Sequence, residues 1–176
     1  MSPLEIAGQV ISVIAVIVSF ITYQMKTSRG ILVTLSIATG ISCIAYGMLG
    51  GTTALGLNLV SIIRNVCFYN KDKKFLSSKA VPVILAAIMA VMSIFLWEGY
   101  HCIFFVVGLT LNTLAMGYFG PQNLRKSILL TSTLIMIYNL FIPSIGGTIN
   151  ELVAISSAVI GLIRYRKVKE TAKAEQ

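Results

Sequence analysis

The amino-acid sequence predicts an all-α polytopic membrane protein, with seven transmembrane helices forming two parallel three-helix repeats joined by an inversion linker helix. Three observations predict this fold. Hydrophobic residues make up 56% of the 176-residue chain and charged residues only 11%, whereas soluble chains carry roughly 25% charged residues. Apolar windows close to the ~20 residues of a bilayer-spanning helix occupy most of the chain and leave no room for a soluble domain. The windows on the two sides of the central one also contain matching motifs. The expected helices are Ile6–Tyr23, Ile31–Leu49, Thr53–Phe68, Ala80–Trp97, Ile103–Phe119, Ser127–Ile142 and Ile149–Tyr165.

The first window, Ile6–Tyr23, is expected to be a true transmembrane helix. A cleaved signal peptide has a basic segment before a short apolar core. Here Met1–Glu5 contains no Lys or Arg, and the apolar run is too long.

Small or weakly polar residues follow one face of each of the first two helices. Small residues let helix backbones approach closely in lipid, so helix packing is the favoured explanation. The lining of a pathway is the alternative. The two rows are Gly8, Ser12, Ala15, Ser19 and Thr22, and then Ser36, Gly40, Cys43 and Gly47.

The central window, Ala80–Trp97, separates two blocks that resemble each other. The first block contains Gly50-Gly51-Thr52 and a helix that ends on Ile62–Arg64. The second contains an outer turn at Pro143 and Gly146-Gly147-Thr148, and a helix that ends on Leu162–Arg164. Because three crossings are an odd number, one additional helix is needed to give the second repeat the direction of the first. We therefore expect a first repeat at 1–74, a linker helix at 75–99, a second repeat at 100–166 and a frayed cytoplasmic tail at 167–176.

The positive residues lie on one side of the predicted membrane. All 14 Lys and Arg fall at or beyond the C-terminal ends of the first, third, fifth and seventh windows. The other connections contain Glu5, Glu98, His101 and Glu151, and no Lys or Arg. Since positive residues are retained in the cytoplasm, the N-terminus is expected outside and the C-terminus inside. The net charge of +8 then indicates contact with anionic lipid headgroups and not a nucleic-acid partner.

Polar residues inside the predicted helices are the candidates for a substrate pathway. An amide at mid-membrane must find a hydrogen-bond partner, so Asn58 either ties helices together or faces a wet cavity. The two arginines near helix ends can snorkel to the headgroups, and the Glu151 carboxylate can be merely interfacial. The candidate pathway residues are Asn58, Ser61, Asn112, Tyr138, Asn139 and Ser157, and the candidate gates or charge partners are Arg64, Glu151 and Arg164.

Catalytic and metal-binding patterns are not predicted. Cys43, Cys67 and Cys102 lie at three membrane depths, which is not a disulfide framework, and His101 has no partner at metal-ligand spacing in the sequence. Paired carboxylates, a Cys/His pair, an HExxH motif and a phosphate-binding loop are all missing from the sequence. We therefore expect no enzyme activity, no metal and no cofactor.

Several segments resemble known families. Gly120-Pro121-Gln122 resembles the PQ element of PQ-loop and SWEET-like proteins, although the corresponding Thr22-Tyr23-Gln24 lacks the proline. The chain is also similar, over nearly all of its length, to the YgjV-type family of small bacterial inner-membrane proteins. That similarity is carried by Tyr46–Arg64, by Ser144–Thr148 with the following Glu151, and by Leu162–Arg164. It implies a bacterial inner-membrane location and brings no assigned substrate.

Two functions from different classes are consistent with these patterns. The first is a SWEET-like transporter or facilitator that moves a small polar solute between the two triplets, because SWEET carriers share the plan of parallel repeats. The alternative is a non-transporting inner-membrane scaffold or accessory protein, which a central interface packed dry by small residues would favour. The lipid bilayer is the expected partner in both, and the oligomeric state is left open.

Overall fold

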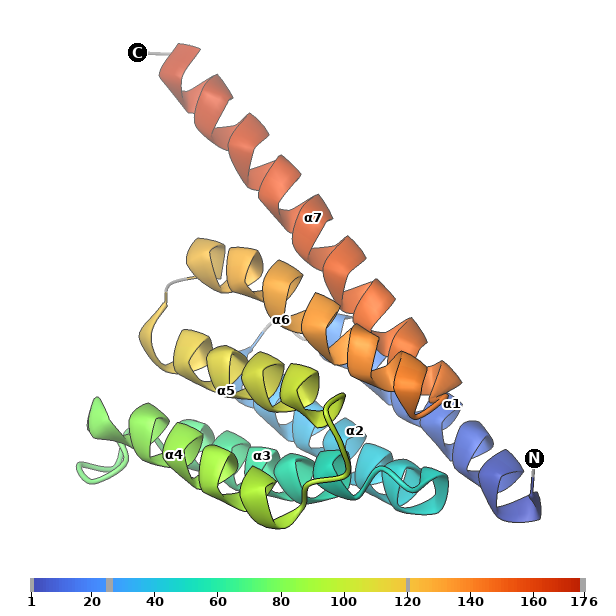
Figure 1. Cartoon of the computed structure of the whole chain (residues 1–176). Helices are drawn as coiled ribbons and strands as arrows, with labels where there is room; N and C mark the ends of the chain where they lie inside the picture. The colour runs from blue at the N-terminus through green and yellow to red at the C-terminus, as the bar shows by residue number, and fades with distance from the viewer. Residues whose placement is uncertain (1, 25–26, 120, 175–176) are drawn as a thin grey trace.

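A computed structural model describes the backbone of residues 2–24, 27–119 and 121–174. Side chains are described for these residues except 23–24, 28, 121–122, 164 and 167–174. Within the described ranges the chain forms seven α-helices and no strand (Figure 1). The helices are α1 (Pro3–Gln24), α2 (Ser28–Leu49), α3 (Thr52–Tyr69), α4 (Ala80–Phe95), α5 (Cys102–Tyr118), α6 (Pro121–Phe141) and α7 (Ile145–Ala174).

All seven predicted helices are present, and three of the described helices are both long and apolar enough to cross a membrane. These three spans are Pro3–Thr22, Arg29–Leu49 and Ile145–Ile163. The helices α4 and α5 are apolar but hold only 16 and 17 residues, which at ~1.5 Å per residue falls short of a ~30 Å hydrocarbon core. The helices α3 and α6 contain more polar residues, including Asn58 and Arg125.

The seventh helix differs from its prediction at both ends. It begins at Ile145 and not at Ile149, because Ser144 Oγ accepts a hydrogen bond from the Gly147 backbone N–H (3.2 Å) and caps the first turn. Gly146 and Gly147 therefore lie in the helix, and the prediction that they form the outer turn is wrong. At its other end the helix continues to Ala174, beyond the predicted end at Tyr165.

The matching motif of the first half does form a turn. Gly50 has a left-handed backbone (φ 81°) and its N–H bonds the Tyr46 carbonyl, which ends α2. Gly51 then precedes α3 directly. A glycine is favoured at the left-handed position because it has no Cβ to clash.

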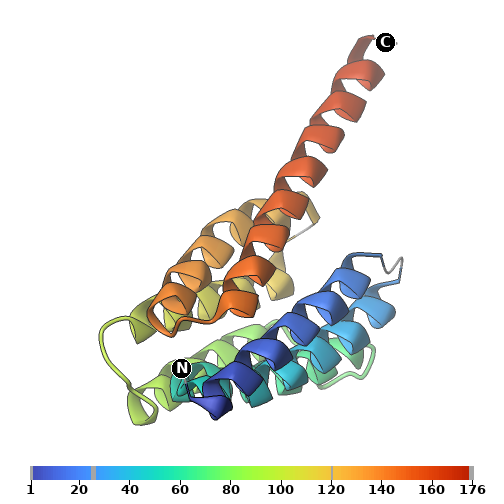
Figure 2. The same ribbon diagram turned by 90° about the vertical axis from the view of Figure 1, so that its right-hand side faces the viewer.

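Six of the helices pack in a closed ring. The helices α1, α2 and α3 pack in series, as do α5, α6 and α7, and contacts of α1 with α7 and of α3 with α5 join the two series. The remaining helix, α4, packs against α3 and α5 (Figures 1 and 2). We call α1–α3 the first half and α5–α7 the second half.

Consecutive helices run in opposite directions, so the bundle has two distinct ends (Figure 2). The connections after α1, α3 and α5 carry Lys and Arg, and we call this the basic end. The connections after α2, α4 and α6 form the acidic end, where Glu98 lies. The helix α7 extends past the rest of the bundle on the basic side (Figures 1 and 2).

The outer surface is apolar while much of the interior is polar. Large hydrophobic side chains such as Ile17, Ile94 and Ile160 are each more than half exposed, although a soluble protein would bury such residues. Several polar side chains are in contrast almost fully buried, among them Arg64 and Asn139. This distribution fits a lipid-facing exterior, in which every interior polar group needs a partner.

Candidate functional site, a polar cavity between the two halves

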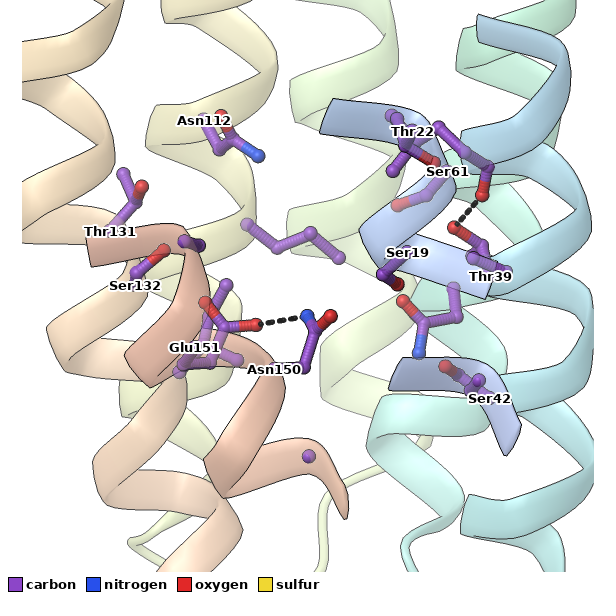
Figure 3. Close-up of a pocket in the computed structure, with 18 of the residues that line it drawn as sticks. Ser19, Thr22, Thr39, Ser42, Ser61, Asn112, Thr131, Ser132, Asn150 and Glu151 are labelled. Carbon is purple, nitrogen blue, oxygen red and sulfur yellow. Dashed lines mark hydrogen bonds between the residues drawn. The ribbon is translucent and has the colours of Figure 1, made fainter. Parts of the chain in front are cut away.

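The central feature of the interior is a cavity of about 570 Å³ lined by helices of both halves. Six helices contribute to its walls: α1, α2 and α3 from one side, and α5, α6 and α7 from the other. Figure 3 shows the polar side chains of the two halves facing each other across this space.

The first half contributes mainly hydroxyl groups. Ser12, Ser19 and Thr22 of α1 line the cavity, so the row of small residues in this helix faces the cavity. In α2 the small row does not line it, and Cys43 Sγ instead lies 3.8 Å from the Leu55 carbonyl of α3. The neighbouring face of α2 lines the cavity, with Leu35, Ala38, Thr39, Ser42, Ala45 and Tyr46.

The third helix supplies three of the predicted pathway and gate residues. Asn58, Ser61 and Arg64 all line the cavity and are each at most 9% exposed. Arg64 does not snorkel, because its guanidinium donates to Asn65 Oδ1 (3.1 and 3.2 Å) and to Thr113 Oγ1 of α5 (3.0 Å). Among the described side chains Arg64 has no carboxylate ion pair.

The second half supplies amides, hydroxyls and one carboxylate. Asn112 of α5 and Ser157 of α7, both predicted pathway residues, line the cavity, as does Glu151. The Glu151 carboxylate accepts a hydrogen bond from Asn150 Nδ2 (3.2 Å), and Ser132 of α6 lies beside it (Figure 3). Asn150 Oδ1 is buried without a hydrogen-bond partner.

Several hydroxyls of the cavity wall donate to a carbonyl of their own helix. Thr39 bonds the Leu35 carbonyl (2.7 Å), Ser61 bonds the Leu57 carbonyl (3.0 Å) and Thr22 bonds the Val18 carbonyl (3.4 Å). A hydroxyl that donates in this way keeps acceptor capacity. The wall therefore combines apolar side chains with hydroxyls that keep acceptor capacity toward the cavity.

The remaining predicted residues lie elsewhere or outside the description. Tyr138 and Asn139 of α6 are fully buried at the acidic end and are not among the cavity-lining residues. Asn139 Oδ1 accepts from Tyr46 (2.5 Å) and the Tyr138 hydroxyl donates to Glu98 Oε2 (3.2 Å). The backbone of Arg164 belongs to α7, but its side chain is outside the described residues.

The two halves are tied together at the acidic end by Gln9 of α1. Its Nε2 donates to the Pro143 carbonyl, and its Oε1 accepts the Ile145 N–H (3.0 Å). One turn further along α1, Ser12 Oγ accepts the Gly146 N–H (3.2 Å). A Cβ at Gly146 would overlap the backbone of Ser12, so the glycine is what allows α1 and α7 to approach this closely.

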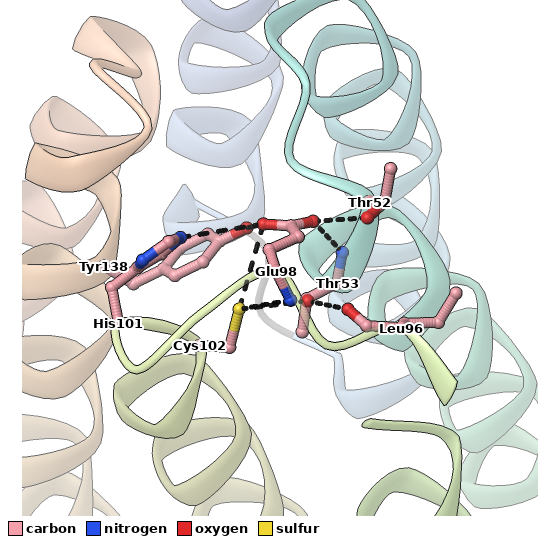
Figure 4. Close-up of polar contacts among 7 residues, drawn as sticks. All are labelled: Thr52, Thr53, Leu96, Glu98, His101, Cys102 and Tyr138. Atoms are coloured by element: carbon pink, nitrogen blue, oxygen red, sulfur yellow. Dashed lines mark hydrogen bonds and ion pairs between the residues drawn. The ribbon is translucent and has the colours of Figure 1, made fainter. Parts of the chain in front are cut away.

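A second polar cluster lies at the acidic end around Glu98, outside the cavity (Figure 4). Glu98 Oε1 accepts from Thr52 Oγ1 (2.6 Å) and from the Thr53 N–H, so the carboxylate caps the N-terminus of α3, where N–H groups lack helical partners. Its Oε2 lies 3.8 Å from His101 Nε2 and 3.8 Å from Cys102 Sγ. The expectation that His101 has no partner at metal-ligand spacing is therefore wrong.

Several residues of both sites are not predicted from the sequence. Thr39 and Ser42 carry no signal that separates them from the small row on the adjacent face of α2. Arg125 of α6 also lines the cavity and donates to the Gly161 carbonyl (3.2 Å). Because it lies near a helix end in the sequence, it was assigned only to the basic loop before α6. The spacing of Glu98, His101 and Cys102 places the three residues within about one turn of chain. Their close approach in the fold also depends on Thr53, which is distant in the sequence.

The comparisons with known proteins place the chain in a family. The model of the family Imp-YgjV, described as bacterial inner membrane protein, matches residues 6–169. The chain belongs to this family. Membership agrees with the three apolar spans and with a location in the bacterial inner membrane, and the family description assigns no activity. Neither the curated proteins nor the solved structures contain a match.

Proposed function

We propose that this chain is a small-solute transporter or facilitator of the bacterial inner membrane, and that a polar solute crosses through the cavity between the two halves. The observation that carries the proposal is the polar lining of that cavity, which both halves supply. Its volume of about 570 Å³ lies within the ~300–1,000 Å³ of small-molecule sites. Polar groups are costly within a membrane, and in transporters they mark substrate pathways.

The helix contacts support the proposed plan of two three-helix repeats with α4 as the linker. Exchanging α1 with α5, α2 with α6 and α3 with α7 maps the ring of contacts onto itself, because α1–α7 becomes α5–α3. Helices paired by this exchange also run in the same direction. Parallel repeats of this kind occur in SWEET carriers, where the site lies at the repeat interface and the repeats rock about it.

Charged residues occupy opposite ends of the proposed pathway. Arg64 is near the end of α3 and Arg125 near the start of α6, so both lie toward the basic end. Glu151 is near the start of α7, toward the acidic end. We propose that these residues act as gates or charge partners of the solute. With the basic end in the cytoplasm by the positive-inside rule, Glu151 faces the outer side.

Cysteine accessibility tests whether the path is wet. Each native cysteine is replaced by serine, and single cysteines are placed by Asn58→Cys and Ser157→Cys. Leu59→Cys and Ser156→Cys are matched controls, because these neighbouring residues face outward and are exposed. A membrane-impermeant thiosulfonate is expected to label positions 58 and 157 and to spare 59 and 156, since a thiol in lipid does not form the reactive thiolate.

Solute flux tests transport itself. Proteoliposomes are mixed with sugars, amino acids or small carboxylates, and osmotic swelling is followed by light scattering. At least one solute is expected to enter faster than in protein-free vesicles, and Asn58→Leu with Ser157→Leu should abolish the difference. A folded protein with no flux and no labelling at 58 or 157 would instead favour the non-transporting scaffold.

A further inference from the structure

We propose that Glu98, His101 and Cys102 form a Zn²⁺ site at the acidic end of the bundle. These residues offer one oxygen, one nitrogen and one sulfur ligand, and the three ligand atoms all lie within 4.8 Å of one another. Carboxylate, imidazole and thiolate are the three ligand types that Zn²⁺ uses in proteins. The site does not line the cavity, so the inference stands apart from the proposed transport.

The separations are close to those of a tetrahedral zinc centre. Glu98 Oε2 is 3.8 Å from His101 Nε2 and 3.8 Å from Cys102 Sγ. Zinc bonds of ~2.0–2.3 Å at tetrahedral angles place neighbouring ligand atoms ~3.3–3.6 Å apart. The third separation, from His101 Nε2 to Cys102 Sγ, is at most 4.8 Å, so side-chain movements of roughly 1 Å or less would bring the three atoms around one ion.

The three ligand atoms differ in the contacts that they already make, and Cys102 Sγ also lies 3.2 Å from Thr53 Oγ1. His101 Nε2 is buried and has no hydrogen-bond partner, which is a cost that an ion would remove. Glu98 Oε1 is committed to capping α3, while Oε2 points toward the other two ligands (Figure 4). The Glu98 backbone N–H donates to Cys102 Sγ (3.4 Å).

The surroundings orient the ligands as an outer coordination shell does. The Tyr138 hydroxyl donates to Glu98 Oε2 (3.2 Å). The His101 ring stacks on Tyr138 and on Phe141, with centroid separations of 5.8 and 5.6 Å. Groups that hold ligands in this way are worth about 10–100-fold in metal affinity.

The fold brings the ligands together over a very short stretch of chain. Glu98 lies in the connection between α4 and α5, and Cys102 is the first residue of α5, so the three ligands span one turn. Gly99 between them has φ of 144°, a conformation that favours glycine. The Glu98 and His101 side chains are 14% and 24% exposed, which leaves room for water as the fourth ligand.

Binding displaces one proton. The Cys102 thiol gives its proton to solvent as the Zn–S bond forms, because only the thiolate is a ligand. The metal affinity is accordingly expected to rise with pH. No electron is transferred, since zinc has no accessible redox chemistry in proteins.

The experiment uses the full chain purified in detergent with a tag that contains no histidine. Co²⁺ serves as the spectroscopic substitute for Zn²⁺, and Zn²⁺ is then added as competitor. We expect one Co²⁺ per chain, a near-ultraviolet thiolate-to-cobalt band and visible bands typical of four-coordination, all removed by Zn²⁺. Cys102→Ser should remove the thiolate band, and His101→Gln should weaken binding by at least about 10-fold.

Controls separate this site from adventitious binding. Cys43→Ser and Cys67→Ser remove cysteines that lie outside the cluster, and both variants should keep the full spectrum. In a chain that retains only Cys102, Zn²⁺ should also slow alkylation of that thiol. Failure of the wild-type chain to bind Co²⁺ or Zn²⁺ at micromolar concentrations, or a thiolate band that persists in folded Cys102→Ser, would overturn the site. Should Cys102→Ser not fold, unchanged affinity in His101→Gln would overturn it equally.

Discussion

The cavity and the Glu98 cluster are both polar regions inside an apolar bundle, but they use their polar groups in opposite ways. In the cavity the polar side chains are spread over six helices, and several of their hydroxyls bond within their own helix. Around Glu98 one carboxylate gathers contacts from Thr52, Thr53 and Tyr138, which join α3 to α6 through the connection before α5. Polar residues that line a cavity and polar residues that hold helices together thus occur in one molecule. They differ in whether their hydrogen bonds converge on one group, as they do at Glu98.

The comparison predicts that substitutions at the acidic end cost stability and that substitutions of cavity hydroxyls do not. The following changes test it, from the largest expected effect to the smallest.

The largest loss of stability is expected at Gly146, which lines the cavity and also forms the contact between α1 and α7. Gly146→Val is expected to destabilise the protein by about 3 kcal/mol, because the new side chain overlaps Ser12 backbone atoms that cannot rotate away. The measurement is the temperature at which half of the monodisperse protein is lost in detergent. Gly161→Ala is the control, since its Cβ would meet only the flexible Arg125 side chain, and an equal loss there would contradict the explanation.

Glu98→Ala should lower the free energy of unfolding by about 2 kcal/mol, because the Thr53 N–H and the Tyr138 hydroxyl both lose their acceptor. Glu151→Ala is the matched carboxylate of the cavity and should change the same melting temperature far less. Equal melting temperatures for the two variants would contradict the proposal that Glu98 stabilises the fold while Glu151 serves the cavity.

Tyr138→Phe should cost about 1 kcal/mol, which is the net worth of one hydrogen bond. The ring remains and keeps its packing on Phe105, with centroids 4.8 Å apart. The same thermal measurement applies, with Tyr100→Phe as the control, because that side chain is 90% exposed. A loss as large as that of Glu98→Ala would show that the Tyr138 hydroxyl has a larger role than one bond.

The smallest effect on stability is expected at Ser157, whose side chain lines the cavity. Ser157→Ala should change the free energy of unfolding by no more than about 0.5 kcal/mol, whereas solute flux in proteoliposomes should change measurably. Ser156→Ala, directed outward, should alter neither quantity. A flux that is insensitive to position 157 would remove this residue from the pathway.

Helix positions and one wall of the cavity were predictable from the sequence. Apolar length locates the helices. The row of Ser12, Ser19 and Thr22 lines the cavity, which was the alternative to the favoured explanation of helix packing. On α7, Ser157 and Glu151 were identified in the same way. In α1 and α7 the polar residues lie on a single face, so the pattern leaves only that face as a candidate for the cavity wall.

The remainder depends on tertiary contacts that a sequence pattern does not contain. The helix α2 carries small and polar residues on two adjacent faces, and only packing on α3 decides that Thr39 and Ser42 line the cavity. Tyr138 and Asn139 sit near the end of α6, where their depth places them at the acidic end. Glu98 meets Thr53 across 45 residues of chain, and this pairing has no local signal.

The ring of six helices has two seams, and they are mechanically unequal. The seam between α3 and α5 is bridged by α4, which packs on both helices and is covalently continuous with them. The seam between α1 and α7 has no such bridge and is fastened at the acidic end by Gln9 and Ser12. A relative rotation of the halves would therefore pivot about the α3–α4–α5 side and separate α1 from α7 on the opposite side. In the proposed transport, the near-symmetric helix contacts would give a one-sided opening that must break the three hydrogen bonds of Gln9 and Ser12, together with the bond from Tyr46 to Asn139.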